Sequence, residues 1–305
     1  MFSKLSLFSS LFFLLTLISS CDKERTPVVV QTDLDTSLYP GNFLNYEYPE
    51  FGENTNTERN VLLEDYTGHQ CSFCPGAAIV AEGLENDNPD RVFVATIHAG
   101  ATANGISDFQ KINSSGMYTR DFTTPEGREM ASTFTDLGEF STNPEGTINR
   151  VEESGKFFLK AAHWSDKVDE VLASELEVNL QAKSNYFEET HGVFLHIETE
   201  FLSDLQGDYN IVGYVIQKKI IDWQLIFGEG PVADYEHHNV HIGNLFGETW
   251  GRNIVSGQVS AGTKLESEFS YQIPSGLEKD DLHFLIYVYD KSSYEVKQVI
   301  KHEIE

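Results

Sequence analysis

The sequence predicts an α/β domain followed by an all-β antiparallel sandwich domain. Between residues 61 and 98 an apolar strand pattern, a helix pattern and a second apolar strand pattern follow one another, which is the order of a βαβ unit. After about residue 177, short strand-like runs are separated by Gly, Asp, Ser and Pro turns, which favours an antiparallel sandwich. Hydrophobic residues make up 40% of the 305 residues and aromatic residues 12%, enough for packed cores in two domains.

The N-terminal residues have the pattern of a secretory signal. Lys4 supplies a positive charge, and residues 5–18 form a run rich in Leu and Phe. The run is too short to span a membrane, which takes about 20 apolar residues. It ends in Ile18-Ser19-Ser20-Cys21, which resembles the bacterial lipobox. We therefore expect residues 1–20 to be a lipoprotein signal peptide and Cys21 to carry the lipid; the alternative is a secreted protein with a chance cysteine at its cleavage site.

Residues 21–54 are predicted to be a tether between this anchor and the first domain. From Asp22 to Asn60 the chain is polar and rich in Pro, Asn, Thr and Glu. Several aromatic residues interrupt this composition. We expect them to dock part of the tether onto the folded protein.

The first domain is predicted to span residues 55–175. Its first strand covers residues 61–66. A helix follows over residues 72–84, up to an Asn-Asp-Asn-Pro stop. Residues 91–98 are almost continuously apolar, which is typical of a strand in a covered sheet.

Three more elements complete the predicted first domain. Thr124 as cap and Pro125 at the first helical position predict a helix to about residue 134. A strand is expected at residues 147–149. A helix is expected at residues 164–176, because its apolar residues fall on one side.

The second domain is predicted to span residues 176–305 as a β-sandwich. Its strand-like runs cover residues 193–202, 209–217, 265–273, 282–290 and 296–304.

The cysteines indicate thiol chemistry. The chain has three, and if Cys21 is lipidated, Cys71 and Cys74 are the remaining pair. They form a CxxC motif at a predicted strand–turn–helix junction, and the N-terminus of a helix lowers the pKa of a thiol there. We expect Cys71 to be exposed at the helix start and to attack, and Cys74 to lie one turn inward and to resolve the mixed disulfide.

This stretch resembles the active site of the thioredoxin fold. The strand, the turn and the motif follow in the thioredoxin order, and Asp65 stands six residues before Cys71, where thioredoxins have a buried Asp. The resemblance implies that Asp65 assists proton transfer and that Pro144 is a cis-proline facing the cysteine pair. The chain departs from the usual pattern in having Gln70 before the motif and Ser-Phe between the cysteines.

A second resemblance covers most of the chain. The segments that carry it are residues 63–75, 124–127, 144–150 and 235–240. They resemble the Omp28 family of Bacteroidetes outer-membrane lipoproteins. That resemblance implies a lipobox, a thioredoxin-like domain and a C-terminal β domain, with the protein lipid-anchored to the outer membrane on its periplasmic or cell-surface side.

The predicted function is thiol–disulfide exchange on exported proteins, whose thiols or disulfides are the substrates, without a cofactor or a metal. Three alternatives stay open. In the first, the CxxC pair is a structural disulfide, although closing a loop of four residues stabilises a protein by only roughly 2 kcal/mol, against nearly 5 kcal/mol for a hundred-residue loop. The pair binds zinc with histidines, although no second CxxC is present. Or the domain is a non-catalytic binding platform of an outer-membrane lipoprotein.

Charge and the histidines complete the prediction. Asp and Glu number 48 against 21 Lys and Arg, a formal charge of −27, so nucleic acid and anionic headgroups are excluded as partners.

His237, His238 and His241 are candidate metal ligands, or simply hydrogen-bonded residues of a loop or strand edge. On a strand, positions 237 and 241 share one face and 238 takes the other. His69 either stabilises a Cys71 thiolate or faces solvent, and the role of His98 is left open.

Overall fold

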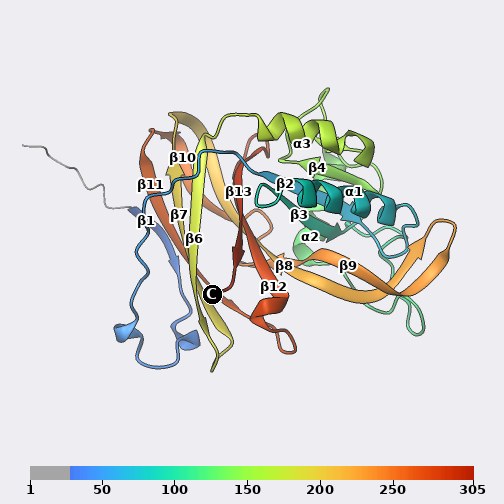
Figure 1. Cartoon of the computed structure of the whole chain (residues 1–305), viewed down its shortest axis with the longest axis horizontal. Coiled ribbons are helices and arrows are strands. Elements are labelled where there is room, and N and C mark those ends of the chain that lie inside the picture. The colour runs from blue at the N-terminus through green and yellow to red at the C-terminus, as the bar shows by residue number, and fades with distance from the viewer. Residues whose placement is uncertain (1–27) are drawn as a thin grey trace, which may run out of the picture.

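A computed structural model describes residues 28–305 as a mixed α/β protein with two sheets (Figure 1). The signal peptide and the lipidation site predicted at Cys21 lie outside the described residues. One sheet has the strand order β1-β11-β7-β6. The other has the order β13-β12-β8-β9-β3-β2-β4-β5, with β10 paired to β8. No helix in the described range is both long and apolar enough to cross a membrane.

The bounds of the elements are as follows. The helices are α1 (Cys74–Asp87), α2 (Pro125–Asp136) and α3 (Trp164–Leu172), with 3-10 helices at Thr36–Leu38, Phe43–Asn45, Ala161–His163 and Lys279–Asp281. The strands are β1 (Val28–Asp33), β2 (Val61–Thr67), β3 (Val92–His98), β4 (Glu145–Ile148), β5 (Phe158–Leu159), β6 (Val178–Phe187), β7 (Gly192–Phe201), β8 (Leu205–Ile226), β9 (Gly230–Asn244), β10 (Arg252–Val259), β11 (Thr263–Gln272), β12 (Leu282–Asp290) and β13 (Val296–Glu303).

Strand β2 is the centre of the helical half. It pairs in parallel with β3 and antiparallel with β4, and all its residues are buried. Val61 and Leu63 pack with residues of α1 and α3. Leu62 and Tyr66 point to the opposite face and pack with residues of α2. Because side chains alternate along a strand, Asp65 lies on the face covered by α1 and α3.

The β half is a sandwich whose two sheets share one apolar core. The four-stranded sheet contributes Val178, Leu195 and Phe269, and the larger sheet contributes Phe284 and Ile286. The strands predicted at 193–202, 265–273, 282–290 and 296–304 are all present, each within one or two residues of its expected bounds. Alternating apolar residues on the inner faces of both sheets produce this layer.

The larger sheet runs without a break through both halves of the chain. Thr96 of β3 is paired with Val240 of β9, which joins the strands of the helical half to those of the sandwich. One core contains Leu62 and Tyr66 together with Tyr214 and Tyr287. A division of the chain at residues 175 and 176 therefore remains a prediction about how the halves behave when they are separated.

The chain before β2 is docked along the sandwich. Strand β1 pairs in parallel with β11, a strand that the composition of the tether did not reveal. Tyr39 and Tyr46 contact Phe187, and Tyr46 also stacks on His196. The aromatic residues of the predicted tether therefore dock it, as the sequence suggested.

Strand β8 is much longer than the predicted run at residues 209–217. It continues to Ile226, turns, and returns as β9. We call residues 218–238 of this hairpin the arm. Figure 1 shows the arm leaving the sandwich and extending alongside the helical half.

Candidate functional site

Cys71 and Cys74 form a disulfide, with their Cα atoms 5.4 Å apart. After β2 ends at Thr67, the backbone turns, and the Cys71 N–H donates to the Gly68 carbonyl at 3.0 Å. The Cys74 N–H then donates to the Cys71 carbonyl at 3.2 Å. Helix α1 begins at Cys74, with Pro75 in its first turn, where the missing N–H costs nothing. Cys74 rather than Cys71 therefore stands at the start of the helix.

Both cysteines are buried, which corrects the expectation that Cys71 is exposed. Cys71 is 2% exposed and Cys74 1%. The strand–turn–helix junction alone would leave the first cysteine open to solvent. It is covered because the arm, which lies some 150 residues further along the chain, crosses the motif.

The arm is attached to the CxxC loop mainly through backbone hydrogen bonds. The Leu225 N–H donates to the His69 carbonyl at 2.8 Å, and the Phe227 N–H donates to the Ser72 carbonyl at 2.9 Å. Between these two bonds, the side-chain amide of Gln224 donates to the Cys71 carbonyl at 3.0 Å. The arm is thus held to the loop by main-chain hydrogen bonds, the kind of contact through which an extended peptide can be bound.

An aromatic pair closes the outer side of this contact. The rings of Phe73, within the motif, and Phe227, at the tip of the arm, are stacked with centroids 4.7 Å apart. Phe73 is 61% exposed and Phe227 68% exposed. The disulfide is therefore dry, while an apolar surface beside it faces solvent.

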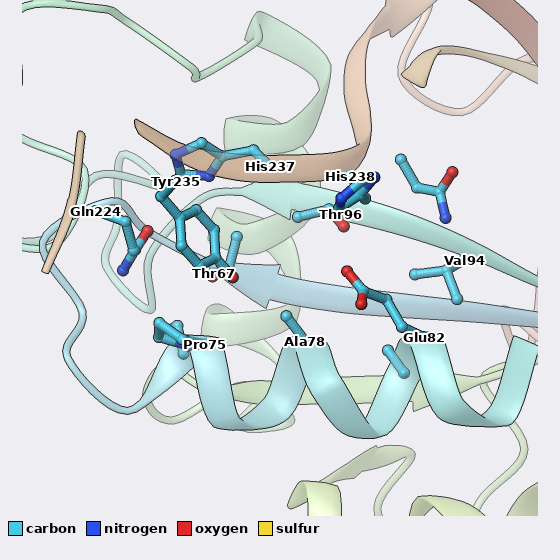
Figure 2. Close-up of a pocket in the computed structure, with 13 residues that line it drawn as sticks. Thr67, Pro75, Ala78, Glu82, Val94, Thr96, Gln224, Tyr235, His237 and His238 are labelled. Atoms are coloured by element: carbon cyan, nitrogen blue, oxygen red, sulfur yellow. The ribbon is translucent and has the colours of Figure 1, made fainter. Parts of the chain in front are cut away.

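A small cavity lies behind the disulfide, between α1 and the arm (Figure 2). Cys74, Pro75 and Thr67 line it from one side, and Tyr235 and His237 of β9 line it from the other. Its volume of about 20 Å³ is enough for one water molecule. The cavity can therefore hold a water beside the inner cysteine but not a substrate.

Asp65 is the unusual acid of this region. Its side chain is 1% exposed, and neither carboxyl oxygen has a hydrogen-bond partner among the described residues. Burial raises the pKa of Asp65 to about 7. At neutral pH Asp65 is therefore divided between its protonated and ionised forms, on the face of β2 that α1 covers.

Pro144 lies at the entry to β4. The Asn143–Pro144 peptide bond is cis, the isomer expected from the sequence. The Asn143 side-chain amide fixes this turn, donating to the Tyr66 carbonyl at 2.8 Å and to the Ala99 carbonyl at 2.9 Å. The register of β4 on β2 puts Pro144 beside the end of β2, where the CxxC loop begins.

Three histidines gather around Phe122 in a buried group that the sequence did not predict. The Phe122 ring centroid lies 4.5 Å from that of His98, 4.6 Å from that of His237 and 5.7 Å from that of His69. Burial lowers the pKa of His237 to about 4 and the pKa of His98 well below its usual value. Burial also lowers the pKa of His69, so its ring is neutral at pH 7, which corrects both expectations for this residue as a cationic partner or an exposed side chain.

The predicted cluster of His237, His238 and His241 does not come together. His237 and His241 are buried while His238 is half-buried, as strand alternation predicted. The His241 ring bonds Thr124 at 3.1 Å and Asn244 at 2.8 Å, away from the arm. Within residues 28–305, no group of three or more His, Cys, Asp or Glu side chains is arranged to hold a metal ion.

The fold and the site define a mixed α/β protein with two sheets and a CxxC disulfide at the start of a helix. A family model described as "Outer membrane protein Omp28" matches residues 131–305, more than half of the chain. The chain therefore belongs to the Omp28 family, as its sequence resemblance predicted. The match begins within α2, so the disulfide precedes the matched segment.

A solved structure, HBP35, resembles the chain in fold, and two others match it at lower TM-scores. HBP35 of Porphyromonas gingivalis is 17% identical with a TM-score of 0.58, over 82% of this chain and 77% of that one. A domain of the outer membrane lipoprotein Omp28 from Porphyromonas gingivalis is 15% identical with a TM-score of 0.29, over 42% of this chain and 88% of that one. A protein of Agrobacterium tumefaciens is 12% identical with a TM-score of 0.49, over 79% and 93%. No curated protein matches the chain.

Proposed function

We propose that this protein is a lipid-anchored thiol–disulfide oxidoreductase of the cell envelope, whose helical half is a thioredoxin-like domain. The observation that carries the proposal is the CxxC disulfide at the start of α1, with the buried carboxyl of Asp65 on the covered face of the adjacent strand. A pKa of about 7 lets Asp65 give and take a proton at neutral pH. Pro144 shapes the substrate groove at the end of β2.

The exchange is balanced by a dithiol of the substrate, an exported protein. A substrate thiolate attacks Sγ of Cys71, the bond between the two cysteines breaks, and its electron pair leaves on Sγ of Cys74, which takes a proton from Asp65. The second substrate thiolate then attacks the substrate sulfur of the mixed disulfide and releases Cys71. The substrate dithiol is oxidised to a disulfide and the cysteine pair is reduced; in the reverse direction, the reduced pair reduces a substrate disulfide.

Trapping tests the assigned roles. In the reducing direction, the Cys71 thiolate attacks a substrate disulfide and Cys74 resolves the mixed disulfide, so with Cys74→Ser we expect unresolved adducts with envelope proteins on a non-reducing gel. Cys71→Ser is the matched control and should trap few. Asp65→Ala should slow exchange without abolishing it. Equal trapping by both cysteine variants, or none by either, would contradict the proposed roles.

We also propose that Cys21 anchors the protein to the outer membrane, on its periplasmic or cell-surface side. The lipobox-like residues 18–21 and the family description support this localisation. Cys21→Ala removes the residue expected to carry the acyl chains, and without two or more chains a protein is not stably anchored. The variant should therefore move from the membrane fraction to the soluble fraction. Membrane retention of this variant would count against lipidation.

A second candidate function is favoured by the burial of both cysteines. In this alternative the disulfide is a local clip, and the protein is a binding or structural lipoprotein. A disulfide that is at most 2% exposed is protected from thiols, as a structural bond would be. Failure of Cys74→Ser to form adducts under conditions that reduce the wild-type disulfide would favour this alternative.

A further inference from the structure

Few contacts hold the arm over the CxxC loop, although the arm buries the disulfide. The arm extends beyond the sandwich, and its side chains include Ile221 at 54% exposure and Phe227 at 68% exposure. Its hold on the CxxC loop consists of two backbone hydrogen bonds, the Gln224 amide and one stacked aromatic pair. Each such interaction is individually weak, so opening the tip is far less costly than unfolding the protein.

We propose that the arm is a displaceable strand that occupies the site where an extended segment of a substrate polypeptide pairs with residues 69–72. This inference rests on the proposed exchange function and adds its substrate class and its regulation. Extended, unfolded segments of exported proteins are the ligands. The closed arm keeps the disulfide out of reach until such a segment takes its place.

The geometry of the arm shows what the site accepts. Leu225, near the end of β8, and Phe227, in the turn that follows, both donate their backbone N–H to the loop, to the carbonyls of His69 and Ser72. Backbone pairing of this kind places few demands on sequence, since any extended polypeptide offers the same donors. The exposed ring of Phe73 adds a preference for an aromatic or large apolar residue at the position that Phe227 fills.

Covalent attachment gives the arm an advantage over a free segment. A tethered strand is present at a high effective concentration, so a substrate replaces it only when it is itself held nearby or binds through further contacts. Small thiols cannot pair with the loop and find the disulfide covered. The arm therefore favours polypeptide substrates over low-molecular-weight thiols.

Hydrogen exchange tests whether the arm opens. The amides of Leu225 and Phe227 should exchange through local opening that is insensitive to low denaturant. The amides of Val212 and Val215, in the part of β8 that pairs with β12, should exchange only on global unfolding. If the arm amides exchange only in step with those of Val212 and Val215, the arm is a fixed part of the fold and the proposal is wrong.

The rate of disulfide reduction by dithiothreitol tests whether opening controls access. Phe227→Ala removes the stacked ring and Gln224→Ala removes the amide bond, and each should speed reduction roughly three- to tenfold. Ile221→Ala is the matched control, an exposed apolar residue on the same arm but with no bond to the CxxC loop. Equal rates for all three variants and the wild type would contradict the gating role.

A labelled peptide with the sequence of residues 221–229 tests the occupant. In fluorescence anisotropy, it should bind the Gln224→Ala, Phe227→Ala double variant at least tenfold more tightly than the wild type, whose own arm competes. The same peptide with Ala in place of its Phe should bind more weakly. No binding to the double variant would overturn the substrate-strand inference even if hydrogen exchange shows opening. If the peptide binds but Cys74→Ser traps no adduct, the strand site stands and the exchange function fails.

Discussion

Glu64 and Asp65 are consecutive residues of β2, and their carboxyl groups meet opposite environments. Glu64 accepts hydrogen bonds from Arg150, Thr147 and Tyr214 at 2.7 to 2.8 Å. Asp65, on the other face, has no hydrogen-bond partner within residues 28–305. Both side chains are almost fully buried, so the difference lies in pairing and not in exposure.

The two carboxyl groups titrate in opposite directions as a result. Burial alone would raise the pKa of Glu64, but the charge of Arg150 and the hydrogen bonds outweigh it and lower the pKa. Asp65 has no such compensation, and burial raises its pKa to about 7. One strand thus carries a permanently ionised, paired carboxylate on one face and a carboxyl group that titrates near neutral pH on the other. This difference indicates a structural role for Glu64 and a chemical role for Asp65.

Arg150→Ala is the strongest way to break the paired face. Removing the guanidinium leaves Glu64 buried and uncompensated, and we expect a loss of about 3 to 5 kcal/mol of unfolding free energy in urea titrations. The double variant Glu64→Gln, Arg150→Met should lose much less, because no charge is left buried. A loss below about 1 kcal/mol for Arg150→Ala would contradict the view that the variant leaves a buried, uncompensated Glu64 carboxylate.

Asp65→Asn sharpens the contrast by removing only the titration. The folded pKa of about 7 is above the usual value of 3.8, so the folded state holds the proton more tightly and wild-type stability falls as pH rises from about 4 to 7. The Asn variant does not titrate, so its free energy of unfolding should rise relative to that of the wild type by about 1 kcal/mol per pH unit across that window. Parallel pH profiles of the two proteins would contradict the raised pKa.

His98→Phe tests the neutral imidazoles of the same region. Burial puts the folded pKa of His98 well below 6.5, so the unfolded state takes up the proton first and wild-type stability falls as pH drops below 6.5. Below pH 6.5 the free energy of unfolding of the variant should therefore rise relative to that of the wild type by up to about 1 kcal/mol per pH unit. His163→Phe, at an exposed position, is the control. An identical gain in that variant would show that burial of His98 is not the cause of the pH dependence.

Thr147→Val should have the smallest effect. It removes one hydrogen bond of 2.7 Å to Glu64 while Arg150 and Tyr214 keep theirs. We expect a loss of about 1 kcal/mol in the same urea titration. A loss as large as that of Arg150→Ala would mean that the hydroxyl, and not the charge, holds the carboxylate.

The sequence predicted the local parts of the site well. The periodic patterns located β2, α1, β3 and α2 to within two or three residues, because apolar periodicity and caps are local signals. Thr124 caps α2 as predicted, accepting a hydrogen bond from the Gly127 N–H. The family resemblance was also correct.

Long-range contacts were beyond a reading of local pattern. Strand β9 is rich in polar and histidine residues, and it is a strand because it pairs with β8. Cys71 is buried under an arm that lies some 150 residues further along the chain, and the lowered pKa of His69 follows from its burial. One local signal was present: the Gly228-Glu229-Gly230 turn directly after the strand-like residues 220–227 is typical of a hairpin.

The arm also carries its own optical reporter. Of the three tryptophans of the chain, Trp223 lies on the arm, directly before Gln224, with Tyr118 6.4 Å away between ring centroids. Trp164, the first residue of α3, is fully buried, and Trp250 packs on Phe134, so neither lies on the arm. A change in emission that follows reduction, and that disappears in Trp223→Phe, would therefore report the position of the arm in real time without an added dye.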